Sequence, residues 1–363
     1  MPQDDDLAAW LRLTLVPGLG SQGVRRLLAE FGLPSRVRAA PTAARARTLG
    51  ESLAARLRAD QSAAQVRAAR DWAARPGHAI VTLADAEYPR ALLEIPDPPA
   101  LLYVRGRTGL LAANGIAVVG SRNATAQGVA NAEALARALS AAHVTVVSGL
   151  ALGIDAAAHR GALRGEGSTV GVLGTGIDVV YPARNADLFD ALAERGAIVS
   201  EFPLGTPAVA ANFPRRNRLI SGLARGVLVV EAALDSGSLI TARLAGEQGR
   251  DVFAVPGSIH SPLSKGCHAL IKQGAKLVES VEDVLGEFAG AASAAPRARA
   301  APEESHVLLQ HLGYDPCNVD TLCERSGLTA EVVSAMLLQL ELEGKVAGLP
   351  GGRFQRVSDR DRS

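Results

Sequence analysis

Five turns rich in glycine and serine follow apolar runs, and their residue types suit the binding of an anion. Glycine lets the backbone approach a ligand closely, and a helix that begins at such a turn presents free N–H groups to negative charge. One such turn is a weak signal, whereas five at one edge of a sheet predict a ligand that carries phosphate. The first four turns along the chain supply the expected contacts, which are Gly120, Ser121, Arg122, Ser148, Gly149, Gly153, Gly174, Gly176, Ser236, Gly237, Ser238 and Thr241.

A cluster of arginines restricts the kind of phosphate-bearing ligand that the site would bind. The segment NFPRRNRLISGL, residues 212–223, places three arginines behind a phenylalanine and a proline at the start of a predicted helix. A run of phosphates needs this many guanidinium groups, and an aromatic face beside a basic groove is typical of single-strand binding. Helical spacing predicts that Arg215 and Arg218 share a face, and that one of the three arginines pairs with a carboxylate instead. The expected DNA contacts here are Phe213, Arg215, Arg216 and Arg218.

Three titratable residues near the turns leave an enzymatic alternative open. His159 follows Asp155 by four residues on one helical face, and Glu231 stands at a strand end, so the three could hydrolyse a nucleotide. The competing interpretation is structural, with Asp155 capping its helix and His159 packed beneath the sheet edge. No nucleophile elbow, Walker motif or metal-ligand spacing accompanies them. The sequence therefore predicts no catalytic residue, no metal and no cofactor.

The elements that would position these residues lie between 79 and 288. Eight runs are almost continuously apolar, as is typical of strands buried on both faces, and the helical patterns between them predict right-handed crossovers. We therefore expect an α/β domain with an extended Rossmann-like, doubly wound parallel sheet, in which ligands bind beyond the carboxyl ends of the strands. The runs are AIVTL, LLYV, IAVV, VTVVS, TVGVL, AIVS, VLVV and DVFAV.

The first 78 residues predict a separate helical domain. The segment LVPGLGSQGVRRLL, residues 15–28, has the pattern of a helix-hairpin-helix (SAM-like) unit, whose turn offers backbone N–H groups to a phosphate. Between Arg25 and His78 stand eleven arginines and four acids, a surplus of +7. A secondary DNA contact is expected here, and it could equally be a helical cap that only resembles the motif. The candidate contacts are Gly18, Gly20, Arg25 and Arg26.

The C-terminal part predicts a linker and a third domain. Residues 289–302 are rich in Ala, Pro and Arg without apolar periodicity, and 303–363 have the pattern of a winged helix. The third helix of a winged helix enters the major groove of DNA, but here it carries only acidic charges, which phosphates repel. Arg353 and Arg356 in the wing are the basic candidates. We expect a partner-binding or weak duplex-binding role.

Overall composition sets broad limits. The 363 residues carry a net charge of +1, and 48% are hydrophobic, which is ordinary for a globular protein. The chain has three cysteines and no C-x-x-C spacing, so we expect neither a disulfide framework nor a zinc site. This cysteine content fits a reducing cytoplasm. The acidic start does not resemble a signal peptide, and no apolar run reaches the ~18 residues of a membrane span. A cytoplasmic location without membrane contact is expected.

Many motifs in order resemble the DNA-processing protein A family (DprA, also called Smf). The resemblance covers about 88–278 and is carried by YPRALLEIPDPPALLYVRG, VVGSR, SGLALGIDAAAHRGAL, VLGTGIDVVYPARN, SEFPLG, FPRRNRLISGL, SGSLITA and VFAVPG. It implies a non-catalytic homodimer, joined through the Rossmann-like domain, that binds single-stranded DNA cooperatively. It also implies protection of incoming strands in natural transformation, loading of the RecA recombinase, and DNA contacts by Arg122 and Arg215. Contacts with a single-strand-binding protein, or weakly with duplex DNA, are further expectations.

Two rival functions remain. A nucleotide phosphoribohydrolase of the related Rossmann-like group would carry a P-G-G-x-G-T motif where this chain has DSGSLIT, residues 235–241. A transcription regulator would act through the winged helix, against which the acidic third helix argues.

Overall fold

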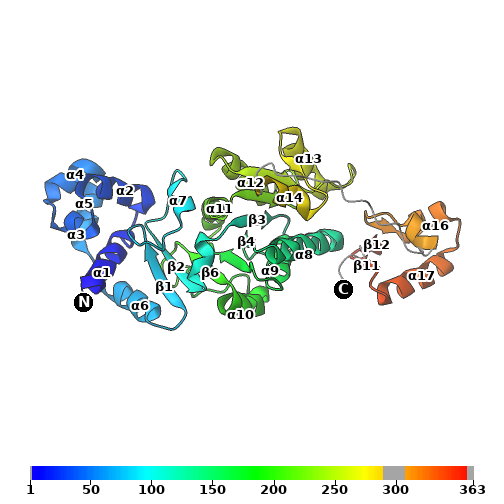
Figure 1. Ribbon diagram of the computed structural model, residues 1–363, viewed down its shortest axis with the longest axis horizontal. Helices are drawn as coiled ribbons and strands as arrows, with labels where there is room; N and C mark the ends of the chain where they lie inside the picture. Colours follow the sequence, from blue (N-terminus) through cyan, green and yellow to red (C-terminus); the bar gives the residue numbers. More distant parts are fainter. Residues whose placement is uncertain (1, 289–306, 358–363) are drawn as a thin grey trace.

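The computed structural model describes residues 2–288 and 307–357, so the predicted linker 289–302 lies outside the described residues. A helical part, a central sheet with its helices and a small winged helix follow one another along the long axis (Figure 1). Within the described ranges, no helix is both long and apolar enough to cross a membrane.

The N-terminal part is helical, as predicted. Its helices bury leucines, valines and two tryptophans in a common core, and Trp72 lies edge-on to Tyr103 of the sheet at 5.7 Å between ring centroids. The helices are α1 (Pro2–Thr14), α2 (Gly20–Phe31), α3 (Pro34–Ala39), α4 (Thr42–Leu49), α5 (Glu51–Ala59) and α6 (Ala63–Ala73).

The central sheet contains a strand for each of the eight predicted apolar runs, and a short ninth strand at its edge. The strands run in the order β1-β2-β6-β5-β4-β3-β7-β8-β9. They are β1 (His78–Thr82), β2 (Leu101–Gly106), β3 (Gly115–Val119), β4 (Thr145–Ser148), β5 (Thr169–Val172), β6 (Ala197–Ser200), β7 (Gly226–Val229), β8 (Asp251–Ala254) and β9 (Lys276–Leu277).

The sheet is parallel from β6 to β9, but its other edge is not. Strand β1 pairs antiparallel with β2, and β2 pairs antiparallel with β6, which corrects the expectation that all eight runs lie parallel. A parallel return needs a crossover, usually a full helix. Between β1 and β2 the prolines of EIPDPPA allow only the four-residue helix α7 (Arg90–Leu93), so the chain turns back instead.

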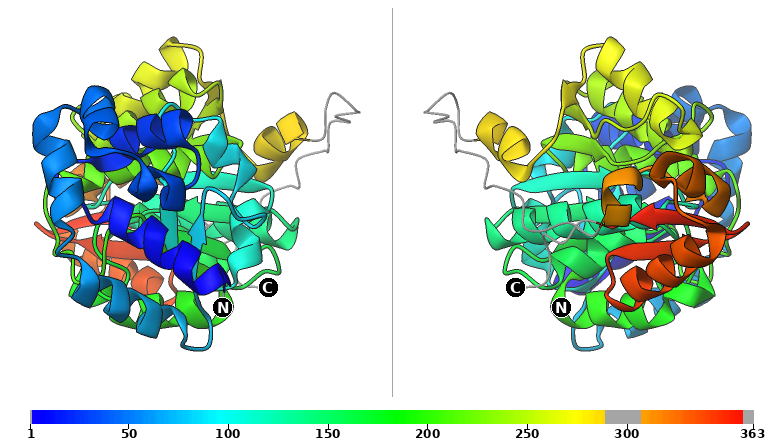
Figure 2. Two further views of the ribbon diagram at one scale, coloured as in Figure 1. Left: turned by 90° about the vertical axis from the view of Figure 1, so that its left-hand side faces the viewer. Right: turned by 90° about the vertical axis from the view of Figure 1, so that its right-hand side faces the viewer.

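Helices cover both faces of the sheet. In Figure 1, α11 and α12 lie above the sheet and α8, α9 and α10 below it, and Figure 2 shows the same layering end-on. Alternate residues of β3 serve the two faces, with Ile116 and Val118 in one apolar core and Ala117 and Val119 in another. The helices are α8 (Ala126–Ala141), α9 (Ile154–Ala162), α10 (Ala186–Arg195), α11 (Asn212–Gly222), α12 (Gly237–Glu247), α13 (Lys265–Lys272) and α14 (Val281–Phe288), with 3-10 turns at Thr108–Ala112, Ala183–Asn185 and Pro262–Ser264.

The C-terminal part is a winged helix, as predicted. Its sheet has the order β10-β12-β11, and Gly351 and Gly352 form the tip of the wing with φ of 82° and 66°. The elements are α15 (Val307–His311), β10 (Cys317–Asn318), α16 (Val319–Ser326), α17 (Ala330–Leu342), β11 (Val346–Leu349) and β12 (Arg353–Arg356). The wing touches the central domain where the Gln127 N–H donates to Gln355 Oε1 at 3.3 Å.

The packing of β2 generates a stability prediction. Leu102 is fully buried in the core, whereas Leu93 in α7 is 52% exposed. Leu102→Ala should cost about 2–5 kcal/mol of unfolding free energy because it leaves a cavity. Leu93→Ala is the matched control and should change it by less than about 0.5 kcal/mol. Urea unfolding followed by circular dichroism measures both, and equal effects would contradict this packing.

Candidate nucleic-acid interface

A cleft of about 760 Å³ lies beyond the carboxyl ends of β3 and β7. The chain leaves β3 toward β4 on one side of the sheet, while β7 and β8 lie on the other. The cleft therefore stands at the topological switch point, where doubly wound sheets bind ligands. Its lining includes the predicted residues Gly120, Ser121, Arg122, Phe213, Arg216, Ser236, Gly237, Ser238 and Thr241.

The turn after β3 forms one wall and carries an exposed cation. The Ser121 N–H donates to Glu231 O at 2.7 Å, and the Ile154 N–H donates to Ser121 O at 3.1 Å, so the segment after β7 and the start of α9 hold the turn. The Arg122 guanidinium lies 5.7 Å from the centroid of the Phe213 ring. Within the described ranges no carboxylate lies within 4 Å of this guanidinium, so its charge is available to a ligand.

A second wall of the cleft is aromatic. Phe213 lies at the start of α11, and the ring of Tyr181 stands 5.4 Å from it at an interplanar angle of 40°. Gly174 makes room for Phe213, because an added Cβ would lie 2.8 Å from its ring. Tyr181 is 45% exposed and lines the cleft, and we did not predict it. The only signal was a tyrosine before a proline in VVYPARN, which is not specific.

Arg216 forms the floor of the cleft. It is 4% exposed, and its guanidinium donates to Gly149 O at 2.7 Å and to Val172 O, at the ends of β4 and β5. Burial lowers the pKa of Arg216 to about 10, an effect that the nearby Asp155 carboxylate opposes. A side chain at Gly149 would collide with both charged groups. The guanidinium is thus fixed by protein acceptors, although its charge still favours an anion above it.

Arg215 and Arg218 share a helical face, as predicted, and that face points to a carboxylate. Both donate to Glu201 Oε2, at 3.0 Å from Arg215 and 2.7 Å from Arg218. Arg218 also lies 3.5 Å from Asp97, and its side chain is 11% exposed, against 46% for Arg215. Neither residue lines the cleft. Of the two, only Arg215 retains surface through which it could reach a phosphate.

The start of α12 closes the cleft on the β7 side. Ser236 caps this helix by accepting from the Ser238 N–H at 3.4 Å, and the two hydroxyls lie 2.7 Å apart. Gly237 leaves this helix N-terminus open, and Thr241 lies one turn further along the same wall. A helix N-terminus attracts negative charge. Asp235 lies next to this helix N-terminus and is exposed. It is the one acidic residue among the lining residues near α12.

Other predicted turn residues support the walls from behind. Ser148 is fully buried and donates to Val118 O at 2.6 Å. Gly153 packs against the backbone of Ser121 and Arg122, and Gly176 lies close to Pro203 O. The fifth turn, after β8, is not part of the lining. Two of the five turns therefore provide most of the cleft surface, and the others hold these two in place.

The three titratable residues of the enzymatic alternative have structural partners. Asp155 Oδ2 accepts from the Gly149 and Ala151 N–H groups at 3.1 and 3.4 Å, so it braces the preceding turn and does not cap its own helix. His159 is fully buried beside Thr169 Oγ1 at 2.7 Å, and burial lowers its pKa to about 3. Glu231 accepts from Thr125 N and Oγ1, at 2.9 and 2.5 Å. Only Asp155 of the three reaches the cleft lining.

The N-terminal hairpin turns at two glycines in the left-handed region, with φ of 81° at Gly18 and 58° at Gly20. Arg25, a candidate DNA contact, instead donates to Pro96 O at 2.7 Å, which ties α2 to the central domain. Arg26 is exposed. Arg56, which we did not single out, donates to Pro17 O at 3.1 Å and so lies at the hairpin turn.

The buried charges beneath the cleft generate a pH prediction. Arg216→Met would leave Asp155 buried without its balancing cation and should cost about 3–5 kcal/mol at pH 7. Burial already raises the pKa of Asp155, and loss of Arg216 would raise it further above its unfolded value of about 3.9. A protonated carboxyl needs no cation, so the loss should shrink as the pH falls through the folded pKa toward the unfolded one.

Urea unfolding between neutral and mildly acidic pH measures this effect. Arg122→Met is the matched control, because it removes the same charge from an exposed position, and it should change stability by less than about 0.5 kcal/mol. A loss in Arg216→Met that does not vary with pH would contradict the role given to Asp155.

Comparisons with known proteins agree with this architecture. Residues 79–289 match the family described as DNA recombination-mediator protein A, and 292–352 match the DprA winged helix domain. Protein Smf of Escherichia coli is 44% identical over 292 residues, which cover 77% of this chain and 78% of that protein. DNA processing protein DprA of Streptococcus pneumoniae is 49% identical over 207 residues, which cover 57% of this chain and 73% of that protein.

Two solved structures are similar in fold. The X-ray structure of DprA from S. pneumoniae gives a TM-score of 0.68 at 39% identity, covering 77% of this chain and 95% of that one. DNA processing protein A from Helicobacter pylori, whose single-stranded DNA binding mode has been described structurally, gives 0.53 at 30% identity, covering 58% and 95%. With a matching family domain over more than half of its length, this chain belongs to the DprA family of DNA recombination-mediator proteins.

Proposed function

We propose that this protein binds single-stranded DNA through the cleft at the β3–β7 switch point, without catalysis. The observation that carries the proposal is the exposed Arg122 guanidinium above the Phe213 ring, 5.7 Å from its centroid. A cation beside an aromatic face is the pairing that single-strand sites use, since the cation takes a phosphate and the ring takes a base. The open helix N-terminus at Gly237 adds a second place for a phosphate.

The cleft binds the strand in an unstacked form. Tyr181 and Phe213 offer two tilted faces, which suits bases that are free of a partner strand. Contacts that backbone N–H and guanidinium groups make to phosphates carry no information on base sequence, so binding is independent of sequence. A mobility shift that compares single- and double-stranded oligonucleotides tests the proposal. Equal affinity for the two would count against it.

The family resemblance supports the wider role. In this proposal the bound strand is protected during natural transformation and passed to the RecA recombinase in the cytoplasm, and a single-strand-binding protein is a further partner. The homodimer forms through the Rossmann-like domain, as the resemblance implies. Light scattering on 79–288 should then show a dimer.

Removal of the winged helix generates one prediction. The cleft is lined entirely by residues between Val119 and Leu263, so loss of 303–363 should leave binding of a short single strand largely intact. Neither residue of the wing contact, Gln127 or Gln355, lines the cleft. A weakening beyond about tenfold, or 1.4 kcal/mol, in a folded truncated protein would contradict the proposal.

The second prediction concerns the contribution of Arg122 to single-strand binding. Arg122→Ala should weaken single-strand binding by about 1.5–3 kcal/mol, because one charge-assisted contact is lost. It should flatten the log–log salt dependence by about 0.7, the value for one phosphate on a single strand. Arg122→Lys should recover only part of the affinity, since it restores the charge without the forked geometry.

Arg243→Ala is the matched control for Arg122. Arg243 lies on α12 in the same domain, its side chain is 70% exposed, and it is not part of the cleft lining. Its loss should change neither the affinity nor the salt slope appreciably. If Arg122→Ala bound normally with an unchanged slope, the DNA path would have to lie elsewhere, with the N-terminal arginines as the next candidates.

A further inference from the structure

Helix α17 of the winged helix is apolar on two opposite faces. Val333, Leu337 and Leu340 are buried in the domain core. Val332, Leu338 and Leu342 are 44%, 60% and 81% exposed, and at 100° per residue they lie within one sector on the other side of the helix. Glu331 and Gln339 fall in the same sector, so polar groups interrupt this second face. Its exposed apolar side chains, Val332, Ala335, Leu338 and Leu342, are here called the α17 stripe, and exposed apolar side chains that gather on one face mark an interaction site.

The charges around the α17 stripe indicate what covers it. The described part of the winged helix, 307–357, has six acidic residues and four Lys or Arg, a balance of −2. Glu331 and Glu341 lie near the two ends of α17, and the helix has no Lys or Arg. Phosphates would be repelled, so the third helix does not suit a DNA groove. An apolar surface bordered by guanidinium groups is its complement.

The N-terminal helices of the protein have this complementary surface. Between Arg25 and His78 the balance is +7, from eleven arginines and four acids. At the corner between α2 and α3, Leu33 is 52% exposed. Arg36 follows it at helical spacing and is exposed, as is Arg26 on α2. This α2–α3 corner, defined by Arg26, Leu33 and Arg36, places an exposed apolar side chain between two helices that each carry an exposed arginine, and Glu30 is the one acidic residue between Arg26 and Arg36.

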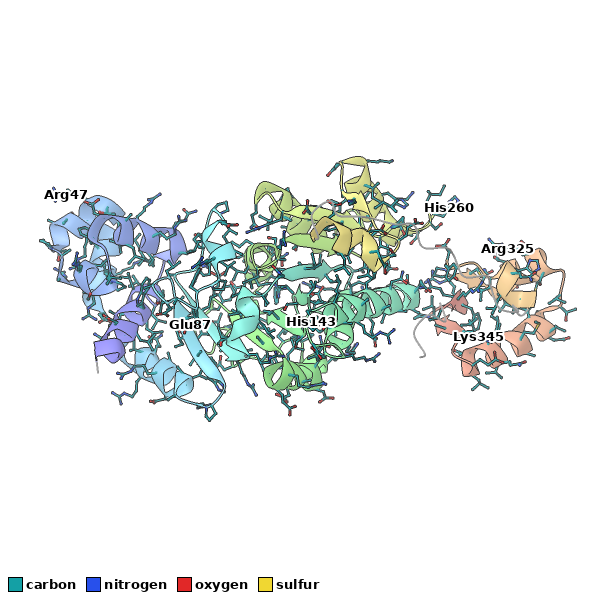
Figure 3. All side chains as sticks on the ribbon, in the orientation of Figure 1. Arg47, Glu87, His143, His260, Arg325 and Lys345 are labelled. Carbon is teal, nitrogen blue, oxygen red and sulfur yellow. The ribbon has the colours of Figure 1, made fainter. Side chains whose placement is uncertain are left out.

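The two surfaces cannot meet within one chain. The N-terminal helices and the winged helix lie at opposite ends of the long axis, as the labels of Arg47 and Arg325 in Figure 3 show. We propose that the α17 stripe of one copy docks on the α2–α3 corner of a second copy. Because the two surfaces differ, the contact is head-to-tail, and it extends into an open chain of molecules where its rotation does not close a ring. The inference rests on the proposed function, for which it provides a physical basis of cooperative coating along a strand.

Two variants, each of which disrupts one of the two surfaces, provide the test. The double substitution Leu338→Glu/Leu342→Glu disrupts the α17 stripe, and Leu33→Glu disrupts the α2–α3 corner. All three side chains are more than half exposed, so the fold should survive, and Leu93→Glu, at a position 52% exposed, is the matched control. Sedimentation velocity of the full-length protein at low salt, without DNA, measures association beyond the basal oligomer.

The wild type and the control should associate further as concentration rises, and less so as salt screens the charges. Each blocked variant alone should need at least about tenfold higher concentration, and an equimolar mixture of the two should regain association, since one supplies the stripe and the other the corner. If Leu33→Glu associated like the wild type, or if the mixture did not recover, the proposed occupant would be wrong.

DNA binding distinguishes this inference from the proposed function. All the variants should bind an oligonucleotide of one-site length as tightly as the wild type, and the blocked variants should lose cooperativity only on a strand that holds several molecules. Unchanged cooperativity in both blocked variants on the long strand would overturn the head-to-tail contact while leaving the cleft as the DNA site.

Discussion

The cleft depends on one buried guanidinium. Arg216 joins α11 to the ends of β4 and β5, because it donates to Gly149 O and to Val172 O. Helix α11 also carries Phe213, three residues before Arg216. The hydrogen bonds of Arg216 therefore position the aromatic wall as well. A buried charge is costly unless its donors are satisfied. The glycine at 149 follows from this requirement, since any side chain there would displace the guanidinium.

The arginines around the cleft divide into fixed and available charges. Arg216 and Arg218 are committed to protein acceptors. Arg216 keeps a positive charge at the floor of the cleft, whereas the carboxylates of Glu201 and Asp97 neutralise Arg218. Arg122 is exposed and can form new bonds with a ligand. Arg218 also helps to join the helical domain to the central domain. Asp97 lies near Arg218 and accepts a hydrogen bond from Ser21 Oγ of α2 at 2.9 Å. The helical domain is thus tied by polar contacts to the helix that shapes the cleft.

Much of this architecture could be predicted from the sequence because its signals are local. The eight apolar runs became strands, and the turns after β3 and β7 met at the switch point. The antiparallel edge was missed, since strand direction depends on whether the intervening segment can form a crossover helix. The roles of the arginines were missed for a related reason. Spacing predicts which of them share a face, but only the tertiary partner Glu201 shows which face is neutralised.

The net charge of +1 conceals a strong separation of charge along the molecule. The segment from Arg25 to His78 in the N-terminal helices carries a surplus of +7, and the winged helix is acidic. If the protein coats a strand as proposed, salt should weaken the coat in two ways. Release of counterions from the phosphates gives a power-law dependence that is set by contacts such as Arg122. Screening between the two ends of neighbouring molecules falls off with the Debye length, about 10 Å at 0.1 M salt. A single salt titration on a long strand mixes both effects, whereas a one-site strand reports the first alone.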